Sequence, residues 1–343
     1  MSKHIFGCML THYGVASNNR GETAGNTTTL RKNMWHGKQH SSFSPESIRY
    51  AARIGMEAMN PEGVNRRTLH NGGLNQAACY TDPNFNEFVA GHYFSDDDVL
   101  GFMNAKSAGV PEAEADTDTE AEADTEADTK KGPKKGPKKA TKNETRARRG
   151  ALDITPAMSL TPYMGDVTFN AASPGASAAA QKGAADEAAK NPVPYSTEIH
   201  ATRYQYNFAM SMDGLKDSKH ALLIIQSLCN LGRVAGNHAR YLFDCSPESM
   251  ILRLTDDMAP RICYAFEEKK NDQIDASTLL FKVEAGDIDP KELYIAGPFA
   301  QTETGKILAK LGVHSFNGVK AAEAAVLNVI QTWIDEAAKK GAK

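Results

Sequence analysis

Groups that bind phosphate are concentrated in one early stretch of the chain. Residues 17–44 form a polar segment rich in Asn, Ser, Lys and Arg, and two arginines follow on a predicted helix. Phosphate oxygens are held by guanidinium and ammonium groups, by small polar side chains and by backbone N–H groups near a helix N-terminus. The candidates for phosphate contact in this stretch are Asn18, Asn19, Arg20, Arg31, Lys32, Lys38, His40, Ser41, Arg49 and Arg53.

A purely structural interpretation of the same stretch is also open. Arg49 and Arg53 have acidic neighbours, Glu46 and Glu57, at spacings that allow ion pairs along one helix. In that case the arginines stabilise the helix and the loop before it is merely polar. Composition alone does not decide between these two interpretations.

Histidine is abundant enough for acid–base chemistry. In a metal-independent ribonuclease, one imidazole activates the 2′-hydroxyl and a second protonates the leaving oxygen. The sequence fixes no pair of histidines for this task, and a histidine beside Gly or Ser is more often a loop residue that makes hydrogen bonds. The histidines considered are His12, His36, His40, His70, His200 and His238.

Motifs of the common catalytic and cofactor sites are missing from the sequence. It contains no Gly-x-Ser-x-Gly elbow, phosphate-binding Walker loop, Gly-x-Gly-x-x-Gly fingerprint or His-Glu-x-x-His helix. The consecutive acids Asp96, Asp97 and Asp98 are carboxylates that could bind a metal, but adjacent acids before an apolar residue are more typical of a solvated turn or helix cap. We therefore assign no catalytic residue, no metal and no cofactor.

The elements that would position the early polar stretch are well marked. Ile5–Tyr13 is a short apolar run typical of a strand buried on both faces. Ser44 and Pro45 predict a capped helix start, and apolar residues at helical spacing carry that helix to about Asn60. The polar stretch is therefore a long connection between a central strand and a helix.

The second half of the chain supplies the rest of a predicted sheet. Residues 198–212 alternate, with His200, Tyr204 and their neighbours two apart on a buried face and Arg203 on a polar face. Helices are expected at 217–231 and 318–338, with further strands at 241–243, 250–254, 279–283 and 293–295. This order predicts an α+β fold, an antiparallel sheet with helices on one face, of the RRM or ferredoxin-like kind.

Two low-complexity segments interrupt this core. Residues 107–150 hold an acidic block followed by a basic block, which nearly cancel within the formal net charge of −3. Such a segment cannot bury enough apolar surface to order itself, so a disordered insertion is expected. An Ala-, Gly- and Ser-rich piece at 171–191 lies between strand-like flanks and predicts a long hairpin with a mobile tip.

Global composition limits the class of protein. The 343 residues are enough for a sizeable core, and no apolar run is long enough to cross a membrane. The N-terminus lacks a secretory cleavage signal. Five scattered cysteines without a Cys-x-x-Cys pair favour a reducing compartment, so we expect a cytoplasmic protein that is not bound to a membrane.

Four sequence blocks together resemble a known family. They are the Asn-Asn-Arg-Gly loop at 18–21, the His-Ser-Ser-Phe-Ser-Pro-Glu-Ser-Ile-Arg-Tyr-Ala-Ala-Arg block at 40–53, the Glu-Ile-His-Ala-Thr-Arg-Tyr-Gln-Tyr strand at 198–206, and Gly-Asn-His-Ala-Arg-Tyr-Leu-Phe-Asp at 236–244. In combination they are similar to the DevR branch of the Cas-seven backbone proteins of type I CRISPR systems, in particular type I-B.

The resemblance implies a fold of the RAMP superfamily, shaped like a right hand. Residues 1–62 and 198–343 would form an RRM-like palm, 63–165 a finger subdomain carrying the disordered insertion at 107–150, and 166–197 a thumb hairpin. Each thumb would reach over to the next copy in a head-to-tail filament. Arg203 and His238 lie in the matching blocks and join the RNA-binding candidates.

The resemblance also implies a function. The chain would be a noncatalytic scaffold that binds CRISPR RNA, polymerises along it with other Cascade subunits and supports pairing of the guide with a target DNA strand. Sequence specificity would then belong to the guide. The alternative is a metal-independent endoribonuclease of the same superfamily that processes repeat RNA, with His40 or His200 essential.

Overall fold

The computed structural model describes most of the chain outside the low-complexity segments. The described residues are 2–19, 21–68, 79–86, 88–89, 91–104, 146–172, 193–234, 238, 241–269 and 272–341. Arg20, His70, most of the predicted insertion and the tip of the predicted hairpin lie outside them.

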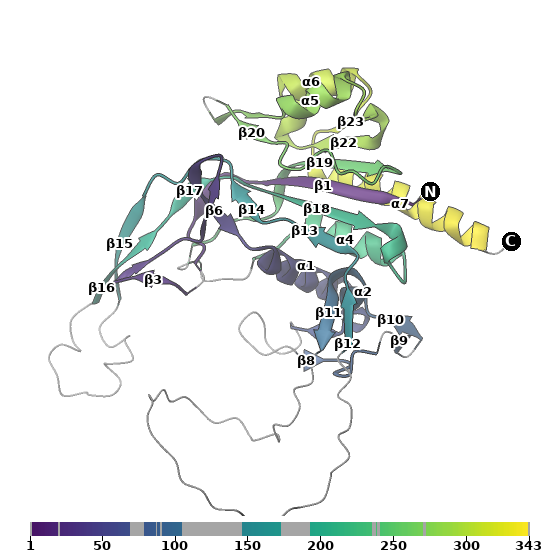
Figure 1. Cartoon of the computed structure of the whole chain (residues 1–343), viewed down its shortest axis with the longest axis horizontal. Coiled ribbons are helices and arrows are strands. Elements are labelled where there is room, and N and C mark those ends of the chain that lie inside the picture. Colours follow the sequence, from purple (N-terminus) through teal and green to yellow (C-terminus); the bar gives the residue numbers. More distant parts are fainter. Residues whose placement is uncertain are drawn as a thin grey trace, which may run out of the picture.

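A large, mainly antiparallel sheet crosses the molecule (Figure 1). Its centre is β1 (His4–Thr11), which pairs antiparallel with β18 (Tyr204–Ser211) on one side and β19 (Pro247–Thr255) on the other. Within the described residues the sheet has nine strands, in the order β23-β22-β19-β1-β18-β14-β6-β5, with β13 also on β18. The remaining members are β5 (Lys32–Trp35), β6 (Lys38–Phe43), β13 (Leu152–Ile154), β14 (Ala157–Ser159), β22 (Leu293–Ala296) and β23 (His314–Phe316).

Three helices pack on one face of this sheet. They are α1 (Pro45–Met59), α4 (His220–Cys229) and α7 (Val319–Gly341). The predicted start of α1 is confirmed, because the Ser44 side chain accepts a hydrogen bond from the Ser47 N–H and Pro45 is the first helical residue. The alternation of β18 is confirmed too: Tyr204, Tyr206, Phe208 and Met210 are all buried in the core beneath the helices.

The opposite face is partly covered, which corrects the prediction of helices on one face only. The helices α5 (Ser277–Glu284) and α6 (Glu303–Lys310) pack there over a second apolar cluster (Figure 1). Residues 279–283, predicted as a strand, belong to α5, because Leu279 and Val283 are buried four residues apart while Phe281 is exposed. The polar side of β18 is also enclosed: Gln205 donates to the Phe266 carbonyl at 2.9 Å.

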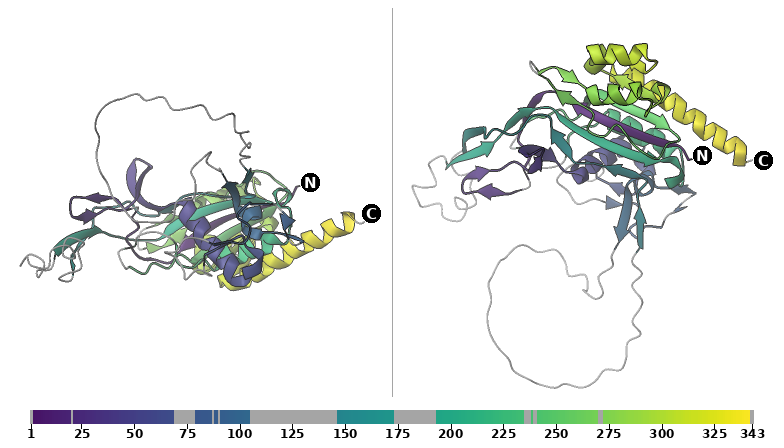
Figure 2. Two further views of the ribbon diagram at one scale, coloured as in Figure 1. Left: turned by 90° about the horizontal axis from the view of Figure 1, so that it is seen from below. Right: turned by 45° about the horizontal axis from the view of Figure 1, so that its top comes forward.

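A hairpin projects from one end of the sheet (Figures 1 and 2). The strands β15 (Val167–Ala172) and β16 (Val193–Glu198) pair antiparallel, as predicted. Two short strands of the early polar stretch, β4 (Thr27–Thr28) and β3 (Thr23–Ala24), extend this hairpin into a small second sheet. At its base, β2 (Gly14–Ala16) pairs with β17 (His200–Thr202).

A subdomain of short elements lies below α1 in Figure 1, and we call it the lower subdomain. Its helix α2 (Ser95–Leu100) leads into a two-stranded ribbon of β11 (Gly101–Asn104) and β12 (Arg146–Arg149). The predicted disordered insertion, residues 107–150, therefore extends too far at its C-terminal end, because residues 146–149 form a regular strand. The other elements there are η1 (Pro61–Gly63), β7 (Arg66–Arg67), β8 (Cys79–Tyr80), β9 (Phe88–Val89) and β10 (His92–Tyr93).

The remaining described segments add little to the site. Residues 241–243, predicted as a strand, are irregular, with Phe243 packed into the core and Leu242 exposed. No helix among the described residues is long and apolar enough to span a membrane. The small elements left are η4 (Met212–Gly214), β20 (Glu267–Glu268), β21 (Ile274–Asp275), η6 (Pro290–Glu292) and η7 (Pro298–Gln301).

Candidate functional site

Glu198 holds the early polar stretch against the base of the projecting hairpin. Its carboxylate accepts hydrogen bonds from the Leu30 N–H at 2.7 Å and from the Lys32 ammonium at 2.7 and 2.8 Å. Its backbone carbonyl accepts from the Ser17 hydroxyl at 3.0 Å. The Lys32 ammonium also lies over the Tyr163 ring, 4.7 Å from its centre. The polar stretch, residues 17–44, is thus fixed against the hairpin, and we call it the ledge. Its anchor Glu198 was predicted from the sequence only as the first residue of a strand.

The two asparagines of the ledge bond to its own backbone. The Asn18 side chain donates to the Ser42 carbonyl, and Asn19 donates to the carbonyls of Glu22 and Thr29. Both residues are buried. Because their amides are occupied and enclosed, these residues shape the loop, and their predicted direct contact with phosphate is not supported by this placement.

Two predicted cations on the ledge are open to solvent or nearly so. Lys38 is exposed beside the turn of the β5–β6 hairpin, where His36 and Gly37 have positive φ angles of 47° and 76°. Arg31 is half-buried at the start of this hairpin. Within the described residues neither has an ion-pair partner. The hairpin is anchored by Trp35, whose ring lies 4.8 Å from that of Tyr264. Arg31 and Lys38 are therefore positioned to attract an anion from outside.

His40, Ser41 and His200 form a buried polar cluster behind the ledge. The His40 Nδ1–H donates to the Ser159 carbonyl at 2.7 Å. The Ser41 hydroxyl bonds to His200 Nδ1 at 2.7 Å and to the Tyr204 hydroxyl at 2.5 Å. Burial lowers the pKa of His40, and burial together with nearby His40 lowers the pKa of His200 to about 4.

This cluster suits a structural role. At neutral pH both imidazoles are uncharged, so neither attracts phosphate as a cation. His200 uses its second nitrogen as well, since Nε2 lies 3.3 Å from the Thr161 hydroxyl. His40 and Ser41 are 5% and 0% exposed, which leaves no room for a direct contact with a strand outside. The structure therefore revises their predicted role from RNA contact to support of the ledge.

Arg49 and Arg53 join α1 to the lower subdomain. The Arg49 guanidinium donates to the Leu100 carbonyl and, at 3.1 Å, to the Leu152 carbonyl. Arg53 Nε lies 3.4 Å from an Asp96 carboxylate oxygen, and its side chain is only 11% exposed. Burial lowers the pKa of both arginines. The prediction that they face RNA is not supported, and the alternative of pairing along the helix missed these partners, which come from residues 43 to 103 positions further on.

The remaining two candidates are also held by protein groups. Arg203 lies on the polar side of its strand, as predicted, but its Nε donates to Glu248 at 3.1 Å and its guanidinium covers the Tyr13 ring at 5.4 Å. His238 is buried, with Nε2 2.9 Å from the Val234 carbonyl. Burial lowers the pKa of His238. The Arg203 side chain stays 14% exposed, whereas His238 is 6% exposed.

The three consecutive aspartates are buried and not solvated, which corrects that prediction. Asp96 accepts from the backbone N–H groups of Asn65 and Arg66 at 2.7 and 3.0 Å. Asp98 accepts from the Lys216 and Asp217 N–H groups, from His220 and from Arg148. No group of three metal-ligating side chains occurs among the described residues. The aspartates therefore tie α2 to its neighbours.

The fold is that of chains found in RNA-guided complexes. No family model matches the sequence. One similar chain, from a structure described as a "CRISPR RNA-guided surveillance complex, pre-nicking", has a TM-score of 0.57 and 10% identity over 95% of this chain and 100% of that chain. A second, from a "CRISPR RNA-guided surveillance complex", has a TM-score of 0.51 and 13% identity, covering 95% and 99%. At such identities the likeness concerns the mixed α/β fold alone.

A curated relative defines the family. The CRISPR-associated protein Cas7/Cst2/DevR of Myxococcus xanthus (strain DK1622) is 40% identical over 329 residues, which are 94% of this chain and 96% of the relative. The chain belongs to the Cas7/Cst2/DevR family, as its sequence blocks predicted. Assignment to type I-B stays a prediction.

Proposed function

We propose that the chain is a noncatalytic subunit that binds CRISPR RNA and, in several copies arranged head to tail, forms the backbone of a type I interference complex, of subtype I-B. The observation that carries this proposal is the 40% identity to a Cas7/Cst2/DevR protein over nearly the whole length of both chains. The likeness in fold to chains of RNA-guided surveillance complexes supports it. We place this assembly in the cytoplasm, with other Cascade subunits as partners.

The proposal assigns three parts of the chain to the palm, finger and thumb of a hand-shaped subunit. The large sheet with α1, α4 and α7 is the RRM-like palm, residues 1–62 and 198–343. The lower subdomain within 63–165 is the finger, and the projecting hairpin within 166–197 is the thumb. Two buried ion pairs, Arg53 with Asp96 and His220 with Asp98, join the proposed palm to the proposed finger.

The ledge is the proposed contact for the RNA backbone. Arg31 and Lys38 supply charge to phosphates, while Lys32, paired with Glu198, keeps the ledge in place. A strand held by its phosphates leaves its bases free, so that the guide pairs with a target DNA strand and sequence is read by base pairing. Non-catalytic binding is consistent with the enclosed, neutral state of His40 and His200.

The experiment has two arms. In the first, the protein is mixed with its CRISPR RNA and imaged by electron microscopy; rows of subunits along the RNA are expected, and single unassociated subunits at saturating RNA would contradict the scaffold. In the second, repeat RNA is incubated with the protein in EDTA. Site-specific cleavage that is lost in His40→Ala or His200→Ala would establish the ribonuclease alternative instead.

A further inference from the structure

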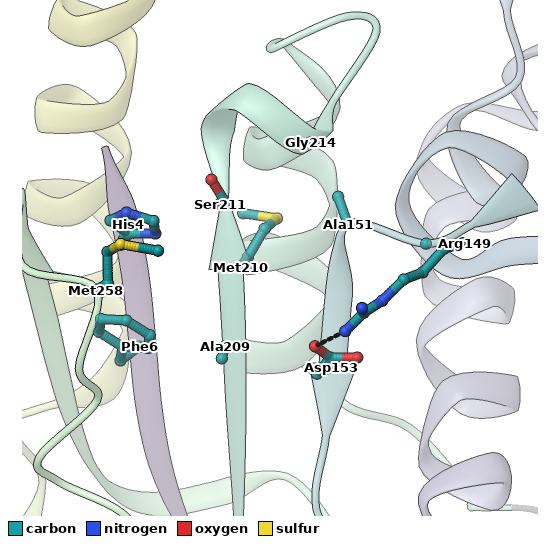
Figure 3. Close-up of a pocket in the computed structure, with 11 residues that line it drawn as sticks. His4, Phe6, Arg149, Ala151, Asp153, Ala209, Met210, Ser211, Gly214 and Met258 are labelled. Atoms are coloured by element: carbon teal, nitrogen blue, oxygen red, sulfur yellow. Dashed lines mark hydrogen bonds and ion pairs between the residues drawn. The ribbon is translucent and has the colours of Figure 1, made fainter. Parts of the chain in front are cut away.

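The loop between β19 and β20, residues 256–266, is fixed at its start by a buried arginine. It begins beside the first residues of β1, where Met258 borders a pocket (Figure 3). The Arg253 guanidinium donates to the Ala259 carbonyl at 2.6 Å and to the Asp257 carboxylate at 3.1 Å. Arg253 is only 2% exposed, so these bonds are shielded from water. The loop therefore leaves the sheet along one defined path.

The end of the same loop is bound by two amides on β18. The Asn207 side-chain oxygen accepts from the Tyr264 N–H at 2.9 Å. The Gln205 side chain accepts from the Phe266 N–H at 3.2 Å and donates to the Phe266 carbonyl at 2.9 Å. Both amides are buried, so breaking these bonds would leave polar groups unpaired away from water. The polar residues on this side of β18 therefore hold the loop in place.

These bonds keep Tyr264 in an uncommon backbone conformation. Its φ angle is 51°, a region that bulky residues avoid and that persists only where surrounding contacts determine it. The Tyr264 hydroxyl donates to the Pro156 carbonyl at 2.8 Å, which fixes the ring as well as the backbone. The ring lies 4.8 Å from the Trp35 ring, at an interplanar angle of 53°. The fixed ring of Tyr264 therefore supports Trp35.

The β5–β6 hairpin places Lys38 directly opposite Trp35. The two residues between them, His36 and Gly37, both have positive φ, as in the tight type I′ turn of two-residue hairpins. In the described part of the chain β5 is the outermost strand of the sheet, so the Tyr264 ring supports an end of the hairpin that no further strand holds. A contact that fixes Trp35 therefore also fixes the backbone of Lys38, its cross-strand neighbour.

Arg31, the other cation proposed to contact phosphate, is held by different bonds. Its N–H donates to the Asn18 carbonyl at 3.0 Å, and its carbonyl accepts from the Ser42 N–H at 2.9 Å. Neither bond involves the loop or Trp35. Arg31 and the hairpin end are therefore fixed independently of each other.

We infer that Tyr264 is a positioning residue for RNA binding, which acts through Trp35 to hold Lys38 where the RNA backbone passes. The inference rests on the proposed function, because it takes Lys38 as a phosphate contact. A lysine on a loose hairpin loses more conformational freedom on binding than a lysine whose backbone is already fixed. Loss of the Tyr264 ring therefore lowers the affinity for RNA, although Tyr264 itself does not touch it.

The test is a double-mutant cycle on the binding of an end-labelled CRISPR RNA, followed by fluorescence anisotropy. Tyr264→Ala removes the ring, and Tyr264→Phe keeps the ring without the hydroxyl. Tyr264→Ala is then combined in turn with Lys38→Ala and with Arg31→Ala. Phe281→Ala is the matched control, because it removes an aromatic ring that is 68% exposed on α5.

The ring contact is followed separately from RNA binding. The chain has two tryptophans, so in a Trp333→Phe background the emission of Trp35 reports on the surroundings of its ring. Tyr264→Ala should shift this emission, and Tyr264→Phe should leave it near that of the unaltered protein. If Tyr264→Ala unfolds by circular dichroism, Trp35→Ala takes its place in the cycle, since it removes the other ring of the pair and leaves the bonds of the loop intact.

Tyr264→Ala should weaken RNA binding at least about threefold, whereas Tyr264→Phe should stay within about twofold of the unaltered protein. The variant that combines Tyr264→Ala with Lys38→Ala should bind as Lys38→Ala does, because the ring then has no lysine to position. In combination with Arg31→Ala the two losses should multiply. Phe281→Ala should bind RNA normally.

Two results of the cycle would overturn the inference: an affinity that Tyr264→Ala leaves unchanged, whether or not Trp35 emission shifts, and losses that multiply when Tyr264→Ala is combined with Lys38→Ala. So would a failure of Tyr264→Phe to restore binding, which would assign the effect to the hydroxyl and its bond to Pro156. Absence of RNA binding by the unaltered protein would instead contradict the proposed function.

Discussion

Lys32 and Glu198 form an ion pair across 166 residues of sequence, with the ammonium 2.7 and 2.8 Å from the two carboxylate oxygens. The pair joins the polar stretch before α1 to the last residue of the projecting hairpin. The two side chains are only 23% and 15% exposed. The ion pair therefore stabilises the fold more than a pair on the open surface would. The ledge and the hairpin therefore form one rigid unit.

We expect Glu198→Gln to loosen this unit. The amide keeps the shape of the side chain but removes its charge, and it accepts at only one oxygen. The free energy of unfolding should fall by about 1–3 kcal/mol in a urea titration. Glu284→Gln, at an exposed position of α5, is the matched control and should change it by less than about 0.5 kcal/mol. Equal stability of the two variants would show that Glu198 does not hold the ledge.

Arg53 tests whether the helix arginines support the fold or contact RNA. Arg53→Met removes the partner of the buried Asp96 carboxylate, so the free energy of unfolding should fall by about 2–4 kcal/mol. Arg261→Met, which breaks a more exposed pair with Asp257, should cost less than about 1 kcal/mol. RNA affinity per folded molecule should stay within about twofold. A tenfold loss of affinity without a loss of stability would restore Arg53 to the RNA contact.

Asp97 should make stability depend on pH. Burial and the neighbouring Asp96 raise the pKa of the Asp97 carboxyl to about 7, although Asn65 donates to it at 2.8 Å. A raised folded pKa means that its stabilising contribution is complete below pH 4, the ordinary range, and is lost as pH rises through 7. We expect Asp97→Asn to be more stable than the unaltered protein at pH 8 and the difference to shrink by pH 5. A difference that is constant over this range would contradict the assignment.

His200 should act in the opposite direction. Its pKa is lowered to about 4, so the unfolded chain takes up a proton near pH 6.5 that the folded chain refuses until about pH 4. The contribution of His200 to stability is therefore complete above pH 6.5 and is lost as pH falls through 4. Chemical unfolding of His200→Gln should depend less on pH between 6.5 and 4 than that of the unaltered protein. An unchanged slope would show that folding does not lower the pKa of His200.

The sequence predicted what local patterns determine. Ser44 and Pro45 fix the start of α1 through bonds within four residues, and the alternation of Tyr204, Tyr206 and Phe208 fixes which side of β18 is buried. The roles of Arg49, Asp98 and His40 depended on partners 51, 118 and 119 positions away, which no local pattern encodes. Residues 279–283 were misassigned because a short apolar run is equally consistent with a strand and with a buried helix face. Within the set of candidate residues, burial separates those that support the ledge from those that face solvent.

The most direct measurement is the salt dependence of CRISPR RNA binding, followed by fluorescence anisotropy. Affinity should fall steeply as salt rises, because phosphate contacts release counterions, and Arg31→Ala and Lys38→Ala should each reduce the slope of log K against log salt by about 0.7. Lys310→Ala, an exposed lysine of α6, should leave the slope unchanged. No measurable affinity at low salt, or an affinity independent of salt, would contradict the account of this chain as an RNA-binding backbone subunit.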